Sequence, residues 1–179
     1  DKILDVLQQY DVKATFFVFG IKSDEMKAVY RRIVDEGHTL GMHSYSNSYS
    51  TIYSSSDSFE KDVTKLNAYL KKVTGEKSQY YRFPGGSNNE ISNVDMSEFI
   101  HVLNEKKITY FDWNVSASDA GGCTTSSCVY NSIINGLSKS RVNVVLIHDT
   151  KMYSADALSD VIKYAKENNY VFKKIENST

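Results

Sequence analysis

A chain of 179 residues is long enough for one domain with a substantial core and too short for two typical domains. Its net charge of −1 argues against the basic surface that nucleic-acid binding requires. Its apolar content of 41% is ordinary for a globular protein, and no apolar run is long enough to span a bilayer. We therefore expect one globular domain over residues 1–179, without nucleic acid or a transmembrane segment.

The first half of the chain alternates between helix-like and strand-like patterns. Apolar residues spaced by three and four predict helices, and short apolar runs that end at glycine or proline predict buried strands. In chain order these are a helix over 2–10, a strand over 14–19, a helix from Ser23 to Gly37, a strand over 38–42, a Ser- and Tyr-rich loop over 44–57, a helix over 59–73 that Gly75 stops, and a strand over 79–83.

The second half continues the alternation. It predicts a helix over about 96–106, a strand over 108–115, a loop over 116–125, a helix over 129–137, a strand over 142–147, a helix over 158–165 and a last strand over 170–172. Such alternation is typical of α/β folds with parallel strands and crossover helices. Because α/β domains usually open on a strand and this chain opens on a helix, we expect a strand to be missing before Asp1, which would leave an open sheet edge.

Two cysteines, Cys123 and Cys128, lie in the loop Gly-Gly-Cys-Thr-Thr-Ser-Ser-Cys. Without further cysteines or a nearby histidine they make a weak metal site. A small loop disulfide is the favoured interpretation and would indicate an oxidising compartment, with two free thiols as the alternative.

Polar and ionisable residues gather at the predicted carboxyl ends of the strands: His43 and Asn47, Arg82, Asp112 and Trp113, and His148 and Asp149. In α/β barrels the working residues lie at these ends. We therefore expect His43, Arg82 and His148 to line one cleft. For each residue alone a structural role is the simpler interpretation, and Arg82 could form a surface salt bridge. We interpret His38 and His101 as structural.

Four motifs at these positions resemble the polysaccharide deacetylases of carbohydrate esterase family four. Residues 14–18 resemble the family's second strand, and residues 41–47 its metal-binding His-[Ser/Thr]-x-x-His motif. Residues 82–86 match its Arg-x-Pro-x-Gly groove motif, and residues 146–149 its Leu-x-His motif. The resemblance implies a distorted (β/α) barrel with fewer than eight strands, and bacterial-type extracellular or cell-wall localisation.

The resemblance also implies a chemistry: hydrolysis of N-acetyl groups in peptidoglycan or chitin, with a divalent metal such as zinc or cobalt held by one Asp and two His. Carried over to this chain, it makes His148 the general acid and Arg82 the group that steadies the catalytic base. It makes His43 and Asn47 the metal-ligand positions. The groove would then be formed by five further residues: Pro84, Gly85, Trp113, Asp112 and Leu146.

The sequence departs from the family pattern in three places. It contains no Asp-Asp pair, although the family uses one such Asp as base and the other as ligand. Asn47 stands where the second ligand His is expected, and a neutral amide oxygen suits zinc less well than imidazole. The region around Trp113 is altered, so either Asp112 or Asp119 could orient His148.

These departures leave the enzymatic activity open between two main readings. The first is a metal-dependent N-deacetylase, incomplete at its N-terminus and impaired, with metal bound weakly or not at all. The second is a non-catalytic carbohydrate-binding relative that uses the same groove. A third is a degenerate domain kept for folding or interaction. The expected partner is an amino-sugar polysaccharide, and the open sheet edge invites self-association.

Overall fold

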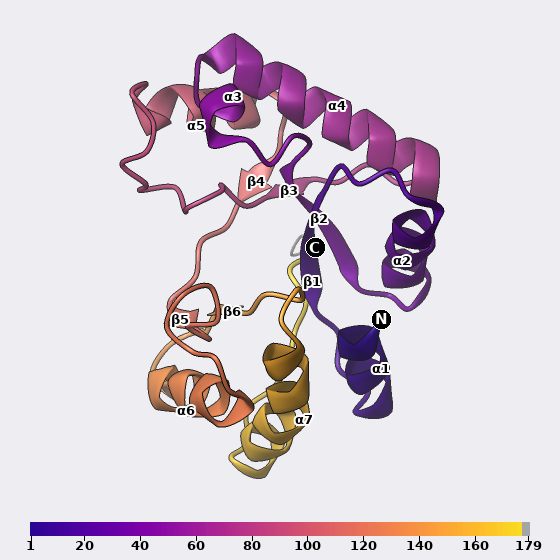
Figure 1. The fold of residues 1–179 in the computed structure, drawn as a ribbon, viewed down its shortest axis with the longest axis vertical. Coiled ribbons are helices and arrows are strands. Elements are labelled where there is room, and N and C mark those ends of the chain that lie inside the picture. Colours follow the sequence, from indigo (N-terminus) through magenta and orange to yellow (C-terminus); the bar gives the residue numbers. More distant parts are fainter. Residues whose placement is uncertain (177–179) are drawn as a thin grey trace. The chain divides into compact units, whose positions relative to one another are not determined.

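The computed structural model describes residues 1–176, in which six strands pair in parallel within two sheets (Figure 1). The strands are β1 (Thr15–Phe19), β2 (Thr39–Ser44), β3 (Tyr80–Tyr81), β4 (Thr109–Tyr110), β5 (Val115–Ser116) and β6 (Val145–Leu146). The helices are α1 (Lys2–Gln9), α2 (Asp24–Asp35), α3 (Tyr49–Ile52), α4 (Ser56–Thr74), α5 (Met96–Glu105), α6 (Ser126–Gly136) and α7 (Met152–Glu167). The predicted α/β class with parallel strands, fewer than eight in the described part, is confirmed.

The chain forms two compact units. Within the described residues, the four-stranded unit comprises residues 15–112 and 174–176, with the strand order β1-β2-β3-β4. The two-stranded unit comprises residues 1–14 and 113–173, with β5 beside β6.

In the four-stranded unit the long helix α4 supplies much of the core. Ser55 caps its start by accepting a hydrogen bond from the backbone N–H of Ser58, and Gly75, at a φ of 86°, ends it in the left-handed conformation. Its inward side chains are fully buried: Phe59, Val63, Leu66 and Leu70. Each contributes about 1.5–3 kcal/mol of burial free energy. The helix predicted over 59–73 is thus confirmed, and its packing supports the residues that follow β2.

In the two-stranded unit α6 packs beside α7 (Figure 1). Their shared core consists of small and branched apolar residues: Val115, Ala117, Cys123, Val129, Ile133, Ala157 and Val161. Helix α1 joins α7 through the hydroxyls of Tyr10 and Ser159, 2.8 Å apart, and through Lys166, which donates to the Tyr10 carbonyl. Cys123 and Cys128 form a disulfide with Cα atoms 5.4 Å apart, which confirms the predicted bridge.

Two predicted strands are wrong. The single strand over 108–115 is divided, because β4 belongs to the four-stranded unit and β5 to the other, with residues 111–114 outside any strand. Residues 170–172 form no strand, and Val171 is 82% exposed. Further on, the chain is fixed by side-chain hydroxyls instead of a strand ladder: Thr15 accepts from the N–H of Ile175, and Thr39 donates to its carbonyl.

Smaller differences concern burial and length. The strand predicted as buried over 14–19 is β1, whose residues are all half-buried. The predicted strand over 142–147 shortens to β6, and Val142 is 81% exposed. The predicted loop over 44–57 contains the short helix α3.

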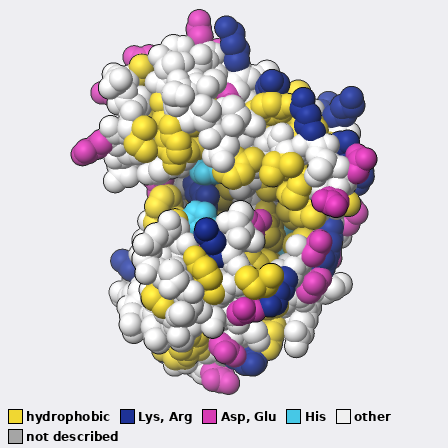
Figure 2. Space-filling model, in the orientation of Figure 1, with side chains coloured by type: hydrophobic (Ala, Val, Ile, Leu, Met, Phe, Trp, Pro, Cys, Tyr) yellow, Lys and Arg dark blue, Asp and Glu magenta, His cyan; other side chains and the backbone are white. Residues whose placement is uncertain are grey.

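Acidic and basic side chains are interspersed over the face shown in Figure 2, in keeping with the net charge of −1. Among the described residues, 1–176, no helix has both the length and the apolar character needed to cross a membrane.

Candidate active site

His43 occupies an irregular position near the end of β2. Along the β1–β2 ladder, Val18 pairs with Met42 but Phe19 pairs with Ser44, so His43 is the extra residue of a β-bulge. Bulges turn a side chain away from the regular alternation and are common beside active sites. The half-buried ring of His43 lies against Phe19, with ring centroids 5.0 Å apart. The predicted place of His43 at the strand end is confirmed.

The protonation of the His43 ring follows from its contact with Arg82. Its Nδ1 lies 2.6 Å from the carbonyl oxygen of Arg82. A carbonyl can only accept, so Nδ1 carries the proton and donates it. When the ring is neutral, its lone pair is then on Nε2, the tautomer that metal-ligating histidines adopt when a carbonyl orients them.

Asn47 lies four residues further on, exposed, in a tight loop. Its φ of 51° is left-handed, a conformation that Asn adopts more readily than most residues. Its backbone N–H donates to the Ser44 hydroxyl at 2.6 Å. A short, hydrogen-bonded loop therefore connects His43, in β2, to Asn47.

Residues 82–86 follow β3 and form the predicted groove motif. The Arg82 guanidinium lies over the ring of Phe17, 5.6 Å from its centroid. Pro84 is buried, and its carbonyl accepts from the hydroxyl of Tyr53, whose pKa burial raises well above its usual range. Gly85 and Gly86 have φ values of 81° and 90°, so this turn requires glycine at both positions.

Asp112 fixes the end of this turn. One carboxylate oxygen accepts from the backbone N–H of Ser87 at 2.9 Å, and the other accepts from the Ser87 hydroxyl. Asp112 is therefore committed to the shape of the groove motif.

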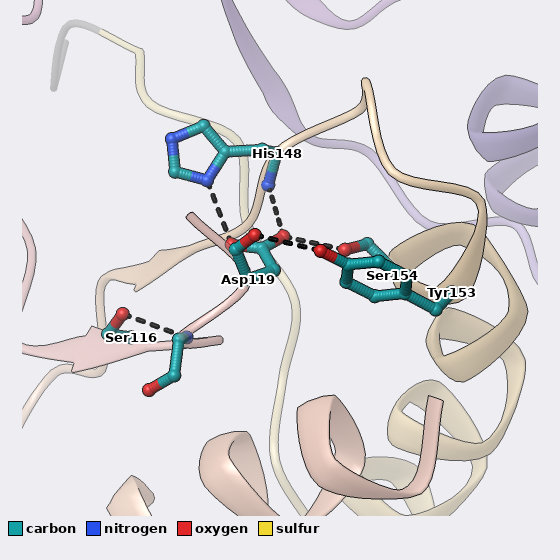
Figure 3. A network of polar contacts seen from close by, with 6 residues as sticks. Ser116, Asp119, His148, Tyr153 and Ser154 are labelled. Carbon is teal, nitrogen blue, oxygen red and sulfur yellow. Dashed lines mark hydrogen bonds and ion pairs between the residues drawn. The ribbon is translucent and has the colours of Figure 1, made fainter. Parts of the chain in front are cut away.

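In the two-stranded unit, Asp119 is the residue that orients His148 (Figure 3). One carboxylate oxygen accepts from ring Nδ1 of His148 at 2.8 Å, and the other accepts from its backbone N–H, also at 2.8 Å. Ser154 donates to Asp119 at 2.6 Å. The side chain of Asp119 is 1% exposed and that of His148 is 33% exposed. A buried carboxylate thus holds a ring that reaches the surface.

The protonation of Asp119 results from two opposing effects. Burial acts to raise the pKa of this carboxyl, but the hydrogen bonds from His148 and Ser154 outweigh it. The net result is a pKa below the usual value, so Asp119 is ionised at neutral pH.

The remaining predicted residues lie as follows. Trp113 is half-buried, Asp149 is exposed, and Leu146 is buried in β6, where its carbonyl accepts from the N–H of Ala117. Of the two histidines interpreted as structural, His38 is buried against Phe16 with its Nε2 3.6 Å from Glu36, and exposed His101 pairs with Glu105. The expectation that His43, Arg82 and His148 share one cleft spans both units and stays a prediction.

The side chains of His43 and Asn47 could supply part of the ligand set of a divalent cation. An oriented imidazole and an amide oxygen are both known donors. Within residues 1–176, no group of three or more His, Cys, Asp or Glu side chains could hold a metal. Two neutral donors fall below the three protein ligands of catalytic zinc sites, so we expect binding through them alone to be weak.

Residues 1–111 match the family model for polysaccharide deacetylase. The chain belongs to this family. YheN of Bacillus subtilis is 30% identical over 99% of this chain and 62% of its own length. The catalytic domain of a peptidoglycan N-acetylglucosamine deacetylase from Eubacterium rectale is 34% identical, with a TM-score of 0.92 over 99% of this chain and 82% of that one.

A third similar protein of the deacetylase family is a pseudoenzyme. It comes from Bacillus anthracis, is 25% identical and has a TM-score of 0.82 over 97% of this chain and 58% of its own. The fold therefore occurs both in active deacetylases and in a pseudoenzyme. The chain spans 58% to 64% of the length of the curated relatives that it matches.

Sequence reasoning left two site features undecided or unseen. It left Asp112 and Asp119 as alternatives for orienting His148, and the hydrogen bonds select Asp119. It did not foresee the bulge at His43, because a bulge is defined by the pairing of two strands and leaves no mark in either strand alone.

Proposed function

We propose that this domain removes N-acetyl groups from amino-sugar polymers of the peptidoglycan type, with activity limited by a weakened metal site. The Asp119–His148 pair is the observation that carries the proposal. A buried, ionised carboxylate that orients a partly exposed imidazole is the arrangement of a general acid or base.

His148 has the role of general acid in this proposal. Because Asp119 accepts from Nδ1, the protonated ring directs its Nε2–H outward, where it can protonate the leaving amine. Arg82, whose guanidinium lies over the ring of Phe17, contributes a positive charge beside β1 in the four-stranded unit. Pro84, Gly85, Asp112, Trp113 and Leu146 are proposed to line the sugar groove.

A divalent metal, zinc or cobalt by family, would be held in part by His43 and Asn47. When bound, such a metal polarises the acetyl carbonyl and lowers the pKa of a water molecule. His43 would provide Nε2, because its Nδ1–H is committed to the Arg82 carbonyl. Asn47 would provide a neutral oxygen in place of a second imidazole, which weakens binding and limits the rate.

Acetate release from N-acetylglucosamine oligomers in the presence of cobalt or zinc tests the deacetylase proposal. We expect slow release that falls by about 10² or more in His148→Ala, the order of a general acid's contribution. His101→Ala, which removes an exposed histidine, is the matched control and should leave the rate unchanged. Equal rates in His148→Ala and the unaltered chain would contradict the role of His148.

A second candidate is glycan binding without catalysis, favoured by Asn47 at a ligand position and by the pseudoenzyme among the structural neighbours. In that case the chain binds oligomers but releases no acetate, and Arg82→Ala or Trp113→Ala weakens binding.

The disulfide supports the proposed extracellular or cell-wall location, since such bridges persist in oxidising compartments. Self-association through the edge of β1 stays a prediction for light scattering.

A further inference from the structure

The loop between His43 and Asn47 is tied to helix α4 by a single carboxylate. Asp62, on α4, is 7% exposed. One of its oxygens accepts from the backbone N–H of Tyr45 at 2.6 Å. The other accepts from the backbone N–H of Ser46 at 3.0 Å and from the Ser46 hydroxyl at 2.8 Å. Three hydrogen bonds from two successive residues thus meet on one buried side chain.

Together with a hydrogen bond between Ser44 and Asn47, these three bonds restrict the backbone of the loop. The Ser44 hydroxyl accepts from the N–H of Asn47, so Tyr45, Ser46 and Asn47 each have a fixed backbone N–H. The direction of these N–H groups sets the peptide planes between the two candidate ligands. The position of the Asn47 side chain relative to His43 therefore depends on Asp62.

The ring of Tyr45 adds a second attachment to the same helix. It meets Tyr69 edge-on, with centroids 6.2 Å apart, and Lys65 Nζ lies 4.1 Å from its centroid. This contact holds the start of the loop against α4, but it places no restraint on Ser46 or Asn47. The carboxylate of Asp62 supplies that restraint.

The burial of Asp62 needs an explanation beyond packing. A buried carboxylate is costly unless hydrogen bonds replace its water, and an apolar residue would cover the loop at lower cost. The charge accepts from backbone N–H groups of a loop whose tip, at Ser46 and Asn47, is exposed and could be solvated instead.

We propose that Asp62 is a positioning residue for the candidate metal ligands, acting on the loop that connects His43 to Asn47. It fixes the backbone over residues 45–47 and thereby the separation of the two donors on His43 and Asn47. This inference rests on the proposed function, in which these two residues face a divalent cation. Residues that orient metal ligands from outside the ligand set typically change metal affinity by about 10- to 100-fold when they are mutated.

Asp62→Asn is the informative variant, because it is nearly isosteric. An amide has one accepting oxygen, so its NH₂ group would face an N–H of Tyr45 or Ser46 and lose that bond. Asp57→Asn is the matched control: it makes the same change at an exposed position in the first turn of α4. Thermal unfolding of both variants reports any general loss of stability.

Two readouts test the proposal. The first is amide hydrogen exchange: we expect faster exchange at Tyr45, Ser46 and Asn47 in Asp62→Asn, and no change in Asp57→Asn. The second is zinc affinity in the Asn47→His background, where the second imidazole strengthens the site. Adding Asp62→Asn should weaken zinc binding by about 10-fold or more, and adding Asp57→Asn should not.

Unchanged exchange at residues 45–47, or unchanged zinc affinity in the double variant, would overturn the positioning role. A folded Asn47→His protein that binds no zinc would instead contradict the ligand assignment of the proposed function. The exchange measurement would then still decide whether Asp62 holds the loop. The two failures are therefore distinguishable.

Discussion

The carboxylate of Asp119 binds His148 twice, through ring Nδ1 and through the backbone N–H, each at 2.8 Å. The same side chain thus fixes the position of the histidine and the tautomer of its ring. Asp119→Asn should keep the shape of the side chain but remove its control over the tautomer of the His148 ring. We expect the Nδ1–H signal of His148 in histidine ¹⁵N NMR spectra to be lost or to exchange rapidly with solvent.

The same variant should lower the rate of acetate release by roughly 10² to 10⁴, the range for loss of an oriented acid–base group. Ser154→Ala removes one hydrogen bond from Asp119 and leaves the contact to the ring, so its effect should be smaller. An NMR spectrum of Asp119→Asn that matches the unaltered chain would show that Asp119 does not set the tautomer.

Asp119 should also make stability depend on pH. Its pKa is lowered in the folded chain, whereas an unfolded Asp titrates near about 3.9. Folding therefore favours the ionised form. Its contribution to the free energy of unfolding is complete above about pH 4 and declines as the pH falls through the lower folded pKa. Urea unfolding from pH 6 to pH 2 should show a steeper loss in the unaltered chain than in Asp119→Asn. Parallel curves would exclude the effect.

Gly41 should be intolerant of any side chain. A Cβ atom at this position would lie 2.5 Å from the ring of Phe17, on which the Arg82 guanidinium rests. We expect Gly41→Ala to destabilise the chain by about 1–3 kcal/mol, the usual cost of overpacking, and to displace Arg82. Gly121→Ala is the control, because no atom lies within 4 Å of its Cβ position. Equal melting temperatures for the two variants would contradict this account of the packing.

The helices and the parallel class of the sheet could be predicted from sequence, because apolar spacing over many residues marks a helix face. Helix α4 is the clearest case, with Phe59, Val63, Leu66 and Leu70 all buried. The short strands could not be bounded in this way. β4 and β5 lie in one apolar run, and only their partners, β3 and β6, show that they belong to different sheets.

Some residues of the candidate site could likewise be predicted from the sequence, and others could not. His43, Arg82 and His148 were recognisable because they stand in motifs of fixed spacing. Asp62 was not singled out, and Asp119 was left as one of two alternatives. Each acts on a residue more than ten positions away, and no local pattern shows which carboxylate is turned toward which loop.

The disulfide should stabilise the loop that carries Asp119. Cys123 is buried in the core shared with α6 and α7, and its N–H donates to the Ser118 carbonyl at 2.7 Å. Closing a loop this short contributes about 2 kcal/mol in the chain-entropy model. Urea unfolding with and without reductant should show that difference, and mass measurement without reductant should show the loss of two protons. Identical unfolding curves for the two forms would contradict this contribution.

The central claim is that Asn47 weakens a metal site that His43 still supports. Calorimetric titration of zinc into the unaltered chain, Asn47→His and His43→Ala tests it most directly. Asn47 has a left-handed φ of 51°, which histidine also tolerates, so the substitution should not disturb the loop. We expect weak binding by the unaltered chain and at least about tenfold tighter binding, or ~1.4 kcal/mol, by Asn47→His. Tight, stoichiometric zinc binding by the unaltered chain, lost in His43→Ala, would contradict the claim.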